Sequence, residues 1–327
     1  MKKLLEIKNL EVCFYLDSAI PAVDGVSFDV YEGETLCVVG ESGCGKSVTS
    51  LSIMQLVATP PGRYLNGEIL YRGKNLLGYS TDEMTKIRGK EISMIFQEPM
   101  TALNPVHRVG KQIGEALRIH EGYDKKEAFK ESIEMLKIVG VPDPVRCANS
   151  FPYQLSGGMR QRVMIAMAIS CNPNMLISDE PTTALDVTIQ QQILDVIKNL
   201  KTKTGMTVMF ITHDLGVVAE IADRVVVMYA GKVVEEACVK DLFANPLHPY
   251  TRALLKCIPR VDEKRDKLDD IKGIVPNPAS FPSGCRFHPR CEEAIKICKT
   301  IVPEEVTLGD RRVSCHLVTQ KAKECRL

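Results

Sequence analysis

The 327-residue chain has neither an excess of charge of one sign nor a long apolar segment. Its 42 Lys and Arg residues balance 41 Asp and Glu residues, so a net charge of +1 indicates neither a nucleic-acid partner nor a polybasic membrane anchor. Glu6 and Lys8 interrupt the N-terminal segment, which therefore lacks the apolar core of a secretory signal. No apolar run approaches the roughly 18 residues of a spanning helix. We expect a cytoplasmic protein that would serve a membrane process only by docking onto other subunits.

A glycine-rich loop follows a short apolar run of strand length, Thr35–Val39, and precedes apolar residues at helical spacing. Its sequence, GESGCGKS, fits the pattern G-x-x-x-x-G-K-[ST], in which backbone N–H groups and the lysine surround phosphate oxygens and the hydroxyl binds Mg²⁺. We therefore predict a nucleotide site at Gly40, Glu41, Ser42, Gly43, Cys44, Gly45, Lys46 and Ser47. Because Cys44 lies in this loop, we expect bound Mg-ATP to slow its alkylation.

A second apolar run, Met175–Glu180, ends in two carboxylates. Asp179 is placed to hold Mg²⁺, and Glu180 to polarise an attacking water, which are the contributions that phosphoryl transfer requires from a protein. Taken alone the pattern is weak, because many strands end in acids at a solvent edge. Its position downstream of a phosphate loop favours the functional interpretation.

Several more apolar runs alternate with helical patterns, which predicts an α/β fold with a parallel sheet. The strand candidates are Ile92–Phe96, Thr207–Ile211 and Arg224–Met228. Between about residues 99 and 160 the pattern becomes helical, with candidate helices at Val109–His120 and Asp124–Val139. Asp124 followed by Glu127 is a capping-box signature. We interpret this stretch as a helical insertion in the sheet core.

Leu155–Met159 reads LSGGM and precedes an apolar helix, so its Ser-Gly-Gly turn provides a second helix N-terminus able to bind an anion. As an isolated pentapeptide it would be a plain helix cap. Lying about twenty residues before the acidic strand, it resembles the signature motif of the ABC ATPases. The usual fifth residue in that family is Gln, and Met159 is a variant common in its peptide-importer branch.

The resemblance implies roles for further residues. Gln97 in IFQEP matches the glutamine that contacts Mg²⁺, and His213 in ITHD matches the switch histidine at the γ-phosphate. Ala184–Asp186 in TTALD matches the D-loop. Phe14 stands where the family places the aromatic that stacks on adenine, with Tyr15 as the alternative. The implied catalytic residues are Glu180, His213 and Gln97, and the implied Mg²⁺ ligands are Ser47, Gln97 and Asp179.

The resemblance also implies an architecture. It predicts a RecA-like P-loop NTPase core with an N-terminal antiparallel β-subdomain and a helical subdomain. Two such ATPases would pair head to tail, as a homodimer or heterodimer, with each ATP between the phosphate loop of one subunit and Ser156, Gly157 and Gly158 of the other. The pair would act on two transmembrane permease subunits. An extracytoplasmic solute-binding protein would deliver the solute to these subunits. We expect a peripheral protein on the cytoplasmic face of the cell membrane, with no nucleic-acid partner.

Five of the 12 cysteines lie in the last 43 residues. Cys285, Cys291, Cys298 and Cys315 are separated by five, six and sixteen residues. These gaps are wider than those between zinc-finger ligands, so a [4Fe–4S] cluster fits better than Zn²⁺. The alternative without a metal is a set of reduced thiols that pack the segment. The importer family is similar here, which supports a cluster, with a structural or a redox-sensing role left open. Cys325 is not expected to be a ligand. Because these cysteines lie far in sequence from every ATP motif, we expect ATP hydrolysis to survive their loss.

We therefore divide the chain into an ATPase domain, residues 1–236, and a Cys-rich C-terminal extension, residues 237–327. The phrase NPLHPYTRALL near its start resembles the extension of oligopeptide and dipeptide importer ATPases and also occurs in related nickel importers. The favoured function is to energise peptide import. The alternatives are an ATPase of a nickel or other small-solute importer, and a soluble ABC ATPase acting on DNA or ribosomes. The last would usually carry two ATPase modules or a long coiled insert, neither of which is present.

Overall fold

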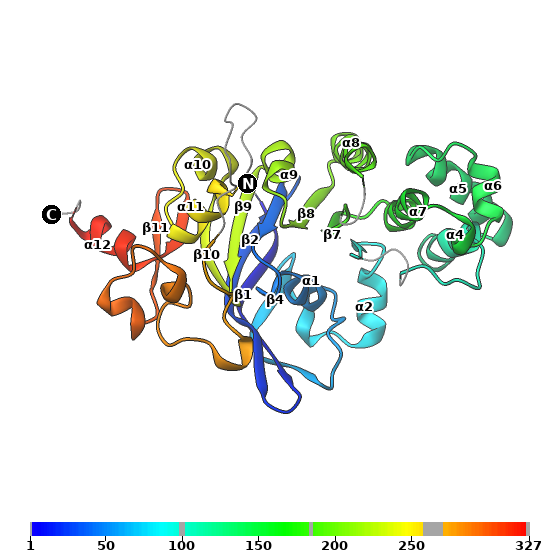
Figure 1. The fold of residues 1–327 in the computed structure, drawn as a ribbon. Helices are drawn as coiled ribbons and strands as arrows, with labels where there is room; N and C mark the ends of the chain where they lie inside the picture. Colours follow the sequence, from blue (N-terminus) through cyan, green and yellow to red (C-terminus); the bar gives the residue numbers. More distant parts are fainter. Residues whose placement is uncertain (1, 98–101, 183–185, 258–270, 325–327) are drawn as a thin grey trace. The chain divides into compact units, whose positions relative to one another are not determined.

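The computed structural model describes residues 2–97, 102–182, 186–257 and 271–324. The chain divides into two compact units. The helical unit comprises residues 1–2, 31–34 and 78–210, and the phosphate-loop unit comprises residues 3–30, 35–77 and 211–327. Figure 1 labels their helices and strands.

The helical unit contains a small parallel sheet and most of the longer helices. Its strands lie in the order β8-β7-β6, with Ile92 opposite Met175 in the parallel pair of β6 and β7. Helices α4, α5, α6 and α7 pack on one another (Figure 1). The elements are α2 (Thr81–Ile87), β6 (Ile92–Ile95), α4 (Val109–His120), α5 (Lys125–Ile138), α6 (Pro144–Asn149), a 3-10 turn (Pro152–Gln154), α7 (Gly157–Ile169), β7 (Met175–Asp179), α8 (Val187–Thr204) and β8 (Thr207–Thr212), which ends in the other unit.

Local sequence explains where the helices of this unit begin. The Asp124 carboxylate accepts hydrogen bonds from the N–H groups of Lys126 and Glu127 at 2.7 and 2.8 Å, and Glu127 accepts one from the N–H of Asp124 at 3.0 Å. This is the predicted capping box, and it satisfies donors that the first helical turn leaves without partners. Helix α4 has the predicted bounds. Helix α6 is not among the predicted helices, although Pro144 at its start is favourable in the first turn of a helix.

The phosphate-loop unit contains two sheets. An N-terminal sheet has the strand order β2-β1-β4-β5, with β1 antiparallel to β4 and β4 antiparallel to β5. A second sheet has the order β11-β12-β10-β9-β3 within this unit, and β3 is parallel to β9. The elements are β1 (Lys3–Tyr15), β2 (Ala19–Tyr31), β3 (Thr35–Val39), α1 (Lys46–Ile53), β4 (Gly62–Tyr71), β5 (Lys74–Asn75), a 3-10 turn (Leu76–Gly78), α9 (Leu215–Ile221), β9 (Arg224–Tyr229), β10 (Lys232–Cys238), α10 (Val239–Ala244), α11 (Pro249–Lys256), three 3-10 turns (Pro278–Ser280, His288–Arg290, Lys296–Lys299), β11 (Glu305–Leu308), β12 (Arg311–Ser314) and α12 (His316–Glu324).

The C-terminal residues extend the second sheet of this unit. Strand β12 pairs antiparallel with β10, with Glu235 opposite Val313, and β11 pairs antiparallel with β12. The predicted parallel core is therefore followed by antiparallel strands. Buried charges help to fix them, because the fully buried Glu235 carboxylate accepts a hydrogen bond from Arg311 at 2.8 Å. Among the described helices, none combines the length and hydrophobicity that a membrane span requires.

Candidate functional site

The phosphate loop lies between β3, which is fully buried, and the N-terminus of α1. Gly45 precedes this helix with φ +100°, a conformation that favours glycine, and a Cβ atom there would lie 2.6 Å from the carbonyl oxygen of Ala22. A Cβ atom on Gly40 would lie 2.2 Å from the carbonyl oxygen of Met228. The two outer glycines of the motif are therefore required by close backbone contacts. The loop and the following helix N-terminus form the strand–loop–helix arrangement that binds phosphates.

Lys46 lies buried at the start of α1 and bends back over the loop. Its ammonium group donates hydrogen bonds to the carbonyl oxygens of Gly40 at 2.7 Å and Glu41 at 3.1 Å. The Cys44 thiol is 3.8 Å from the same nitrogen and is only 1% exposed. Burial raises the pKa of this thiol above its ordinary value, although the Lys46 charge opposes the rise. The Cys44 side chain is thus buried within the loop. This differs from the expectation that bound Mg-ATP would slow the alkylation of an accessible Cys44 thiol.

Two further predicted residues lie in the same unit. His213 directly follows β8 and is exposed, and Asp214 caps helix α9 by accepting a hydrogen bond from the N–H of Gly216 at 2.8 Å. Phe14 lies near the end of β1 opposite Gly62 and is half-buried. Tyr15 is 44% exposed, with the Arg63 guanidinium 5.2 Å from its ring centroid. Both aromatic candidates for adenine stacking are therefore at the end of a strand.

In the helical unit, the structure brings Glu180 and Gln97 together. The Gln97 amide donates a hydrogen bond to the Glu180 carboxylate at 3.3 Å. Asp179 is buried at the end of β7, whereas Glu180 is half-buried and has φ +45°, which is unusual for a residue with a side chain. Backbone strain of this kind is common at functional sites. It turns Glu180 out of the strand direction while Asp179 stays in the sheet.

The signature segment caps helix α7, as predicted. The Ser156 hydroxyl accepts a hydrogen bond from the N–H of Met159 at 3.4 Å. The Gln161 amide, one turn further on, donates to the carbonyl oxygen of Pro181 at 2.6 Å, which ties this helix to the residue after Glu180. Of the D-loop, residues 184 and 185 lie outside the described residues, and Asp186 caps α8 by accepting from the N–H of Ile189 at 2.9 Å. One hollow is lined by Ser156, Gly157, Gly158, Met159 and Asp186, among others.

The four cysteines of the predicted cluster lie in the phosphate-loop unit. The N–H of Cys285 donates to the carbonyl oxygen of Cys298 at 2.8 Å. Burial raises the pKa of the Cys285 thiol to about 11, and the nearby Cys298, Cys315 and Cys291 add to the rise. Backbone hydrogen bonds lower the thiol pKa values of Cys285, Cys291 and Cys315 in part, so backbone donors are aimed at three of the four sulfurs.

These cysteines are gathered, but they do not form a site for a single metal ion. No group of three or more His, Cys, Asp or Glu side chains among the described residues could hold one. The described residues therefore show neither the zinc alternative nor the [4Fe–4S] cluster, and the cluster remains a prediction.

Sequence reasoning missed two residues that contact the phosphate loop. Arg290, which lies between Cys285 and Cys291, donates to the Glu41 carboxylate at 2.7 and 3.1 Å. The Tyr250 hydroxyl accepts a hydrogen bond from the N–H of Glu41 at 3.0 Å. Distance in sequence from the ATP motifs therefore does not keep the cysteine segment away from the phosphate loop. The feature of the sequence that could have indicated this contact is Arg290, a charged residue between two predicted ligand cysteines.

Two family models match separate parts of the chain. Residues 23–183 match the family model described as ABC transporter, and residues 234–298 match the one described as oligopeptide/dipeptide transporter, C-terminal region. The oligopeptide transport ATP-binding protein AppD of Bacillus subtilis is 52% identical, covering 99% of both chains. The dipeptide transport ATP-binding protein DppD of the same organism is 51% identical, covering 100% of this chain and 98% of DppD. This chain belongs to the ABC transporter ATP-binding proteins.

As a member of this family, the ABC protein is an ATPase with the α/β cassette fold of P-loop NTPases. A solved dimeric structure of the bacterial ABC transporter cassette MJ0796 has a TM-score of 0.65 and 31% identity, covering 72% of this chain and 98% of MJ0796. The same cassette is known in a dimeric post-hydrolysis state bound to ADP and Pi, with the same TM-score, identity and coverage. The α/β P-loop cassette and the ATPase reaction class predicted from the sequence are thus confirmed, whereas the Cys-rich extension stays a prediction.

Proposed function

We propose that this ABC ATPase energises the import of dipeptides or oligopeptides. The observation that carries the proposal is that the similarity to peptide transport proteins extends through the C-terminal extension, to 99% of AppD at 52% identity. The matched C-terminal region, residues 234–298, carries a peptide-transporter description of its own. The proposed cargo therefore rests on this C-terminal match and on the similarity to AppD over nearly the full chain.

We assign the chemistry to the residues of the sequence motifs. Lys46 and the backbone of residues 40–47 bind the β- and γ-phosphates, and Phe14 stacks on adenine. Ser47, Asp179 and Gln97 hold Mg²⁺, which neutralises charge on the phosphates. Glu180 accepts a hydrogen bond from the attacking water, a role that its hydrogen bond with Gln97 supports by orienting the carboxylate. His213 contacts the γ-phosphate.

The remaining assignments concern the assembly. A second ATPase subunit places its Ser156, Gly157, Gly158 and Asp186 against the ATP bound by the first. The hollow that these four residues help to line at α7 supports this role. The dimeric form of the similar MJ0796 cassette also supports pairing. Two permease subunits and a solute-binding protein complete the importer, with this ATPase on the cytoplasmic face of the membrane.

We also propose the domain division at residues 236 and 237 and one [4Fe–4S] cluster in the extension. Cys285, Cys291, Cys298 and Cys315 would hold the cluster. Ligation would stabilise a segment with little apolar core of its own, which is a structural contribution. The gathering of the four thiols and the backbone donors at three of them support the proposal.

Nutritional growth tests the peptide assignment directly. In a strain that requires one amino acid, deletion of the gene for this chain should abolish growth on a dipeptide that contains it and leave growth on the free amino acid unchanged. Uptake of radioactive nickel by the same cells is the matched control. Normal growth on dipeptides combined with lost nickel uptake would replace the proposed cargo with nickel.

A further inference from the structure

The second residue of the phosphate loop is held from the C-terminal extension by both its side chain and its backbone. The Arg290 guanidinium donates two hydrogen bonds to the Glu41 carboxylate, from Nη1 at 2.7 Å and from Nη2 at 3.1 Å. Tyr250 Oη accepts the hydrogen bond from the Glu41 N–H at 3.0 Å. Paired bonds between guanidinium and carboxylate fix orientation as well as distance. Glu41 is therefore restrained in position and direction.

Arg290 is itself fixed by the backbone on its other side. Its Nε donates to the carbonyl oxygen of Lys272 at 3.1 Å, and Nη2 also donates to that of Ile271 at 2.9 Å. The Tyr229 hydroxyl lies 3.4 Å from Nη1, and the Arg290 side chain is only 4% exposed. An arginine held in this way is a rigid support, in contrast to a mobile surface ion pair, which would contribute little.

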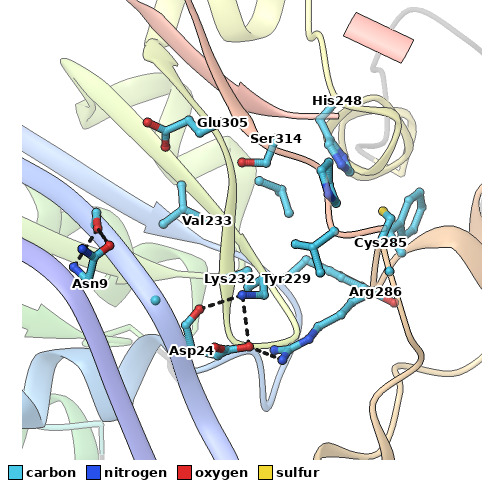
Figure 2. A pocket seen from close by; sticks show the side chains of 17 residues that line it. Asn9, Asp24, Tyr229, Lys232, Val233, His248, Cys285, Arg286, Glu305 and Ser314 are labelled. Carbon is cyan, nitrogen blue, oxygen red and sulfur yellow. Dashed lines mark hydrogen bonds and ion pairs between the residues drawn. The ribbon is translucent and has the colours of Figure 1, made fainter. Parts of the chain in front are cut away.

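The same segment contacts the neighbourhood of the loop a second time through Arg286. This side chain donates to the Asp24 carboxylate and to the carbonyl oxygen of Ala230, and Figure 2 shows it extended from beside Cys285 toward Asp24. The adjacent Gly231 donates its N–H to the carbonyl oxygen of Cys44 in the loop at 3.0 Å. Between the two arginines, the Phe287 ring packs against those of Tyr229 and Tyr250, with centroids 5.2 and 5.3 Å apart. The segment between Cys285 and Cys291 is thus built onto the phosphate loop.

Electrostatics indicates what this contact does for the ATPase. The loop binds a polyanion, yet Glu41 brings a negative charge into it. An unpaired carboxylate at that position would repel the phosphates and would be free to change the course of the loop backbone. Pairing with the buried Arg290 balances this charge and restrains the Glu41 side chain.

We propose that Arg290 is a positioning residue for ATP, which acts through Glu41 and makes nucleotide affinity depend on the C-terminal cysteine segment. Each guanidinium nitrogen of Arg290 already has a protein partner, so we assign it a positioning and not a catalytic role. This inference rests on the ATP site proposed above. It adds an effect on the nucleotide site to the structural role proposed for the extension.

Mg-ADP binding to the purified full-length chain, measured by calorimetry, tests the proposal. Arg290→Ala should raise the Kd about tenfold, since the loss of a charge-assisted pair corresponds to about one decade in affinity. The KM for ATP should rise by a similar factor, with kcat changed less. In a Glu41→Gln background, Arg290→Ala should have less than about a twofold further effect, because the pair no longer exists. Arg290→Lys, which keeps the charge without the paired geometry, should give an intermediate Kd.

Arg252→Ala is the matched control. It also removes an arginine ion pair of the extension, the 3.0 Å contact with Glu293, which does not involve the phosphate loop. This variant should bind Mg-ADP like the parent, and thermal unfolding should verify that every variant is folded. An unchanged Kd in Arg290→Ala, an equal loss in the Glu41→Gln background, or an equal loss in Arg252→Ala would each overturn the proposal. A parent chain that fails to bind Mg-ADP would instead overturn the proposed ATP site.

Discussion

At the level of single residues, water activation and nucleotide binding depend on different side chains. Glu180→Gln keeps the size of the side chain and its contact with Gln97 but loses the charge that polarises water. We expect hydrolysis to fall at least about 100-fold while Mg-ATP binding is retained, as is typical when a general base is neutralised. Lys46→Ala should weaken nucleotide binding itself. Phosphate release and calorimetry measure the two effects, and hydrolysis at the parent rate by Glu180→Gln would contradict the assigned role.

The burial of Cys44 changes the expected result of thiol labelling. Alkylation requires an accessible thiolate, and this thiol is 1% exposed with a raised pKa. We therefore expect iodoacetamide to leave Cys44 of the native protein unlabelled at neutral pH, with or without Mg-ATP, and to label it fully after unfolding. Mass spectrometry of the Cys44 peptide provides the measurement. Rapid labelling that Mg-ATP prevents would mean that the thiol faces the phosphates after all.

Which residues could be predicted depends on how local their signals are. Lys46, Glu180 and Ser156 belong to short motifs whose spacing carries the chemistry, and the structure places each at the end of the predicted strand or the start of the predicted helix. Arg290 and Glu41 are 249 residues apart, and no local pattern relates them. Their contact depends on how the chain folds back, which a single sequence does not specify.

At the scale of elements, the N-terminus of helix α11 contains a pH-dependent contact. The Nδ1 atom of His248 accepts a hydrogen bond from the N–H of Tyr250 at 3.0 Å, which requires that nitrogen to be unprotonated. Complete burial, with the nearby Arg252 charge, lowers the pKa of His248 to about 3, from about 6.5 for an ordinary histidine. Between these values the unfolded chain binds one more proton than the folded chain, so stability is lost as the pH falls.

We expect the free energy of unfolding to decrease by about 1.4 kcal/mol per pH unit below pH 6.5 through this residue. His248→Asn is the matched control, because asparagine also caps helices and does not titrate in this range. Urea unfolding at pH 7, 6 and 5 measures the difference between parent and variant. Equal pH dependence in the two proteins would show that His248 is not held neutral.

Some regular elements followed from apolar runs and capping, and those that were missed include strands with a physical cause for the miss. The predicted strands at residues 35, 92, 175, 207 and 224 begin where the structure begins them, because each is a short buried apolar run. Strands β11 and β12 were missed. They are four residues each and include charged residues such as Arg311 and Arg312, which are stabilised by the buried Glu235 and Glu236 of β10. Such strands depend on partners elsewhere in the chain and lack an apolar pattern of their own.

At the scale of the whole molecule, the cluster proposal makes a compositional prediction. Protein purified without oxygen should be brown and contain about four irons per chain, as a [4Fe–4S] cluster requires. Changing Cys285, Cys291, Cys298 or Cys315 to Ser should bleach it, whereas Cys325→Ser should not. Because Arg290 lies beside Cys291, we now also expect Cys291→Ser to raise the Kd for Mg-ADP. Colourless, iron-free protein from anaerobic preparations would contradict the cluster proposal. The four cysteines would then be reduced thiols that pack the C-terminal segment.

The central claim is that ATP hydrolysis by this chain drives peptide uptake. Its most direct test is uptake of a radiolabelled dipeptide by cells whose only copy of the gene carries Glu180→Gln, compared with cells carrying the parent gene at equal expression. The account predicts that uptake falls to the level of the gene deletion, while the variant protein still binds Mg-ATP and nickel uptake is unchanged. Dipeptide uptake at the parent rate in the Glu180→Gln cells would contradict it.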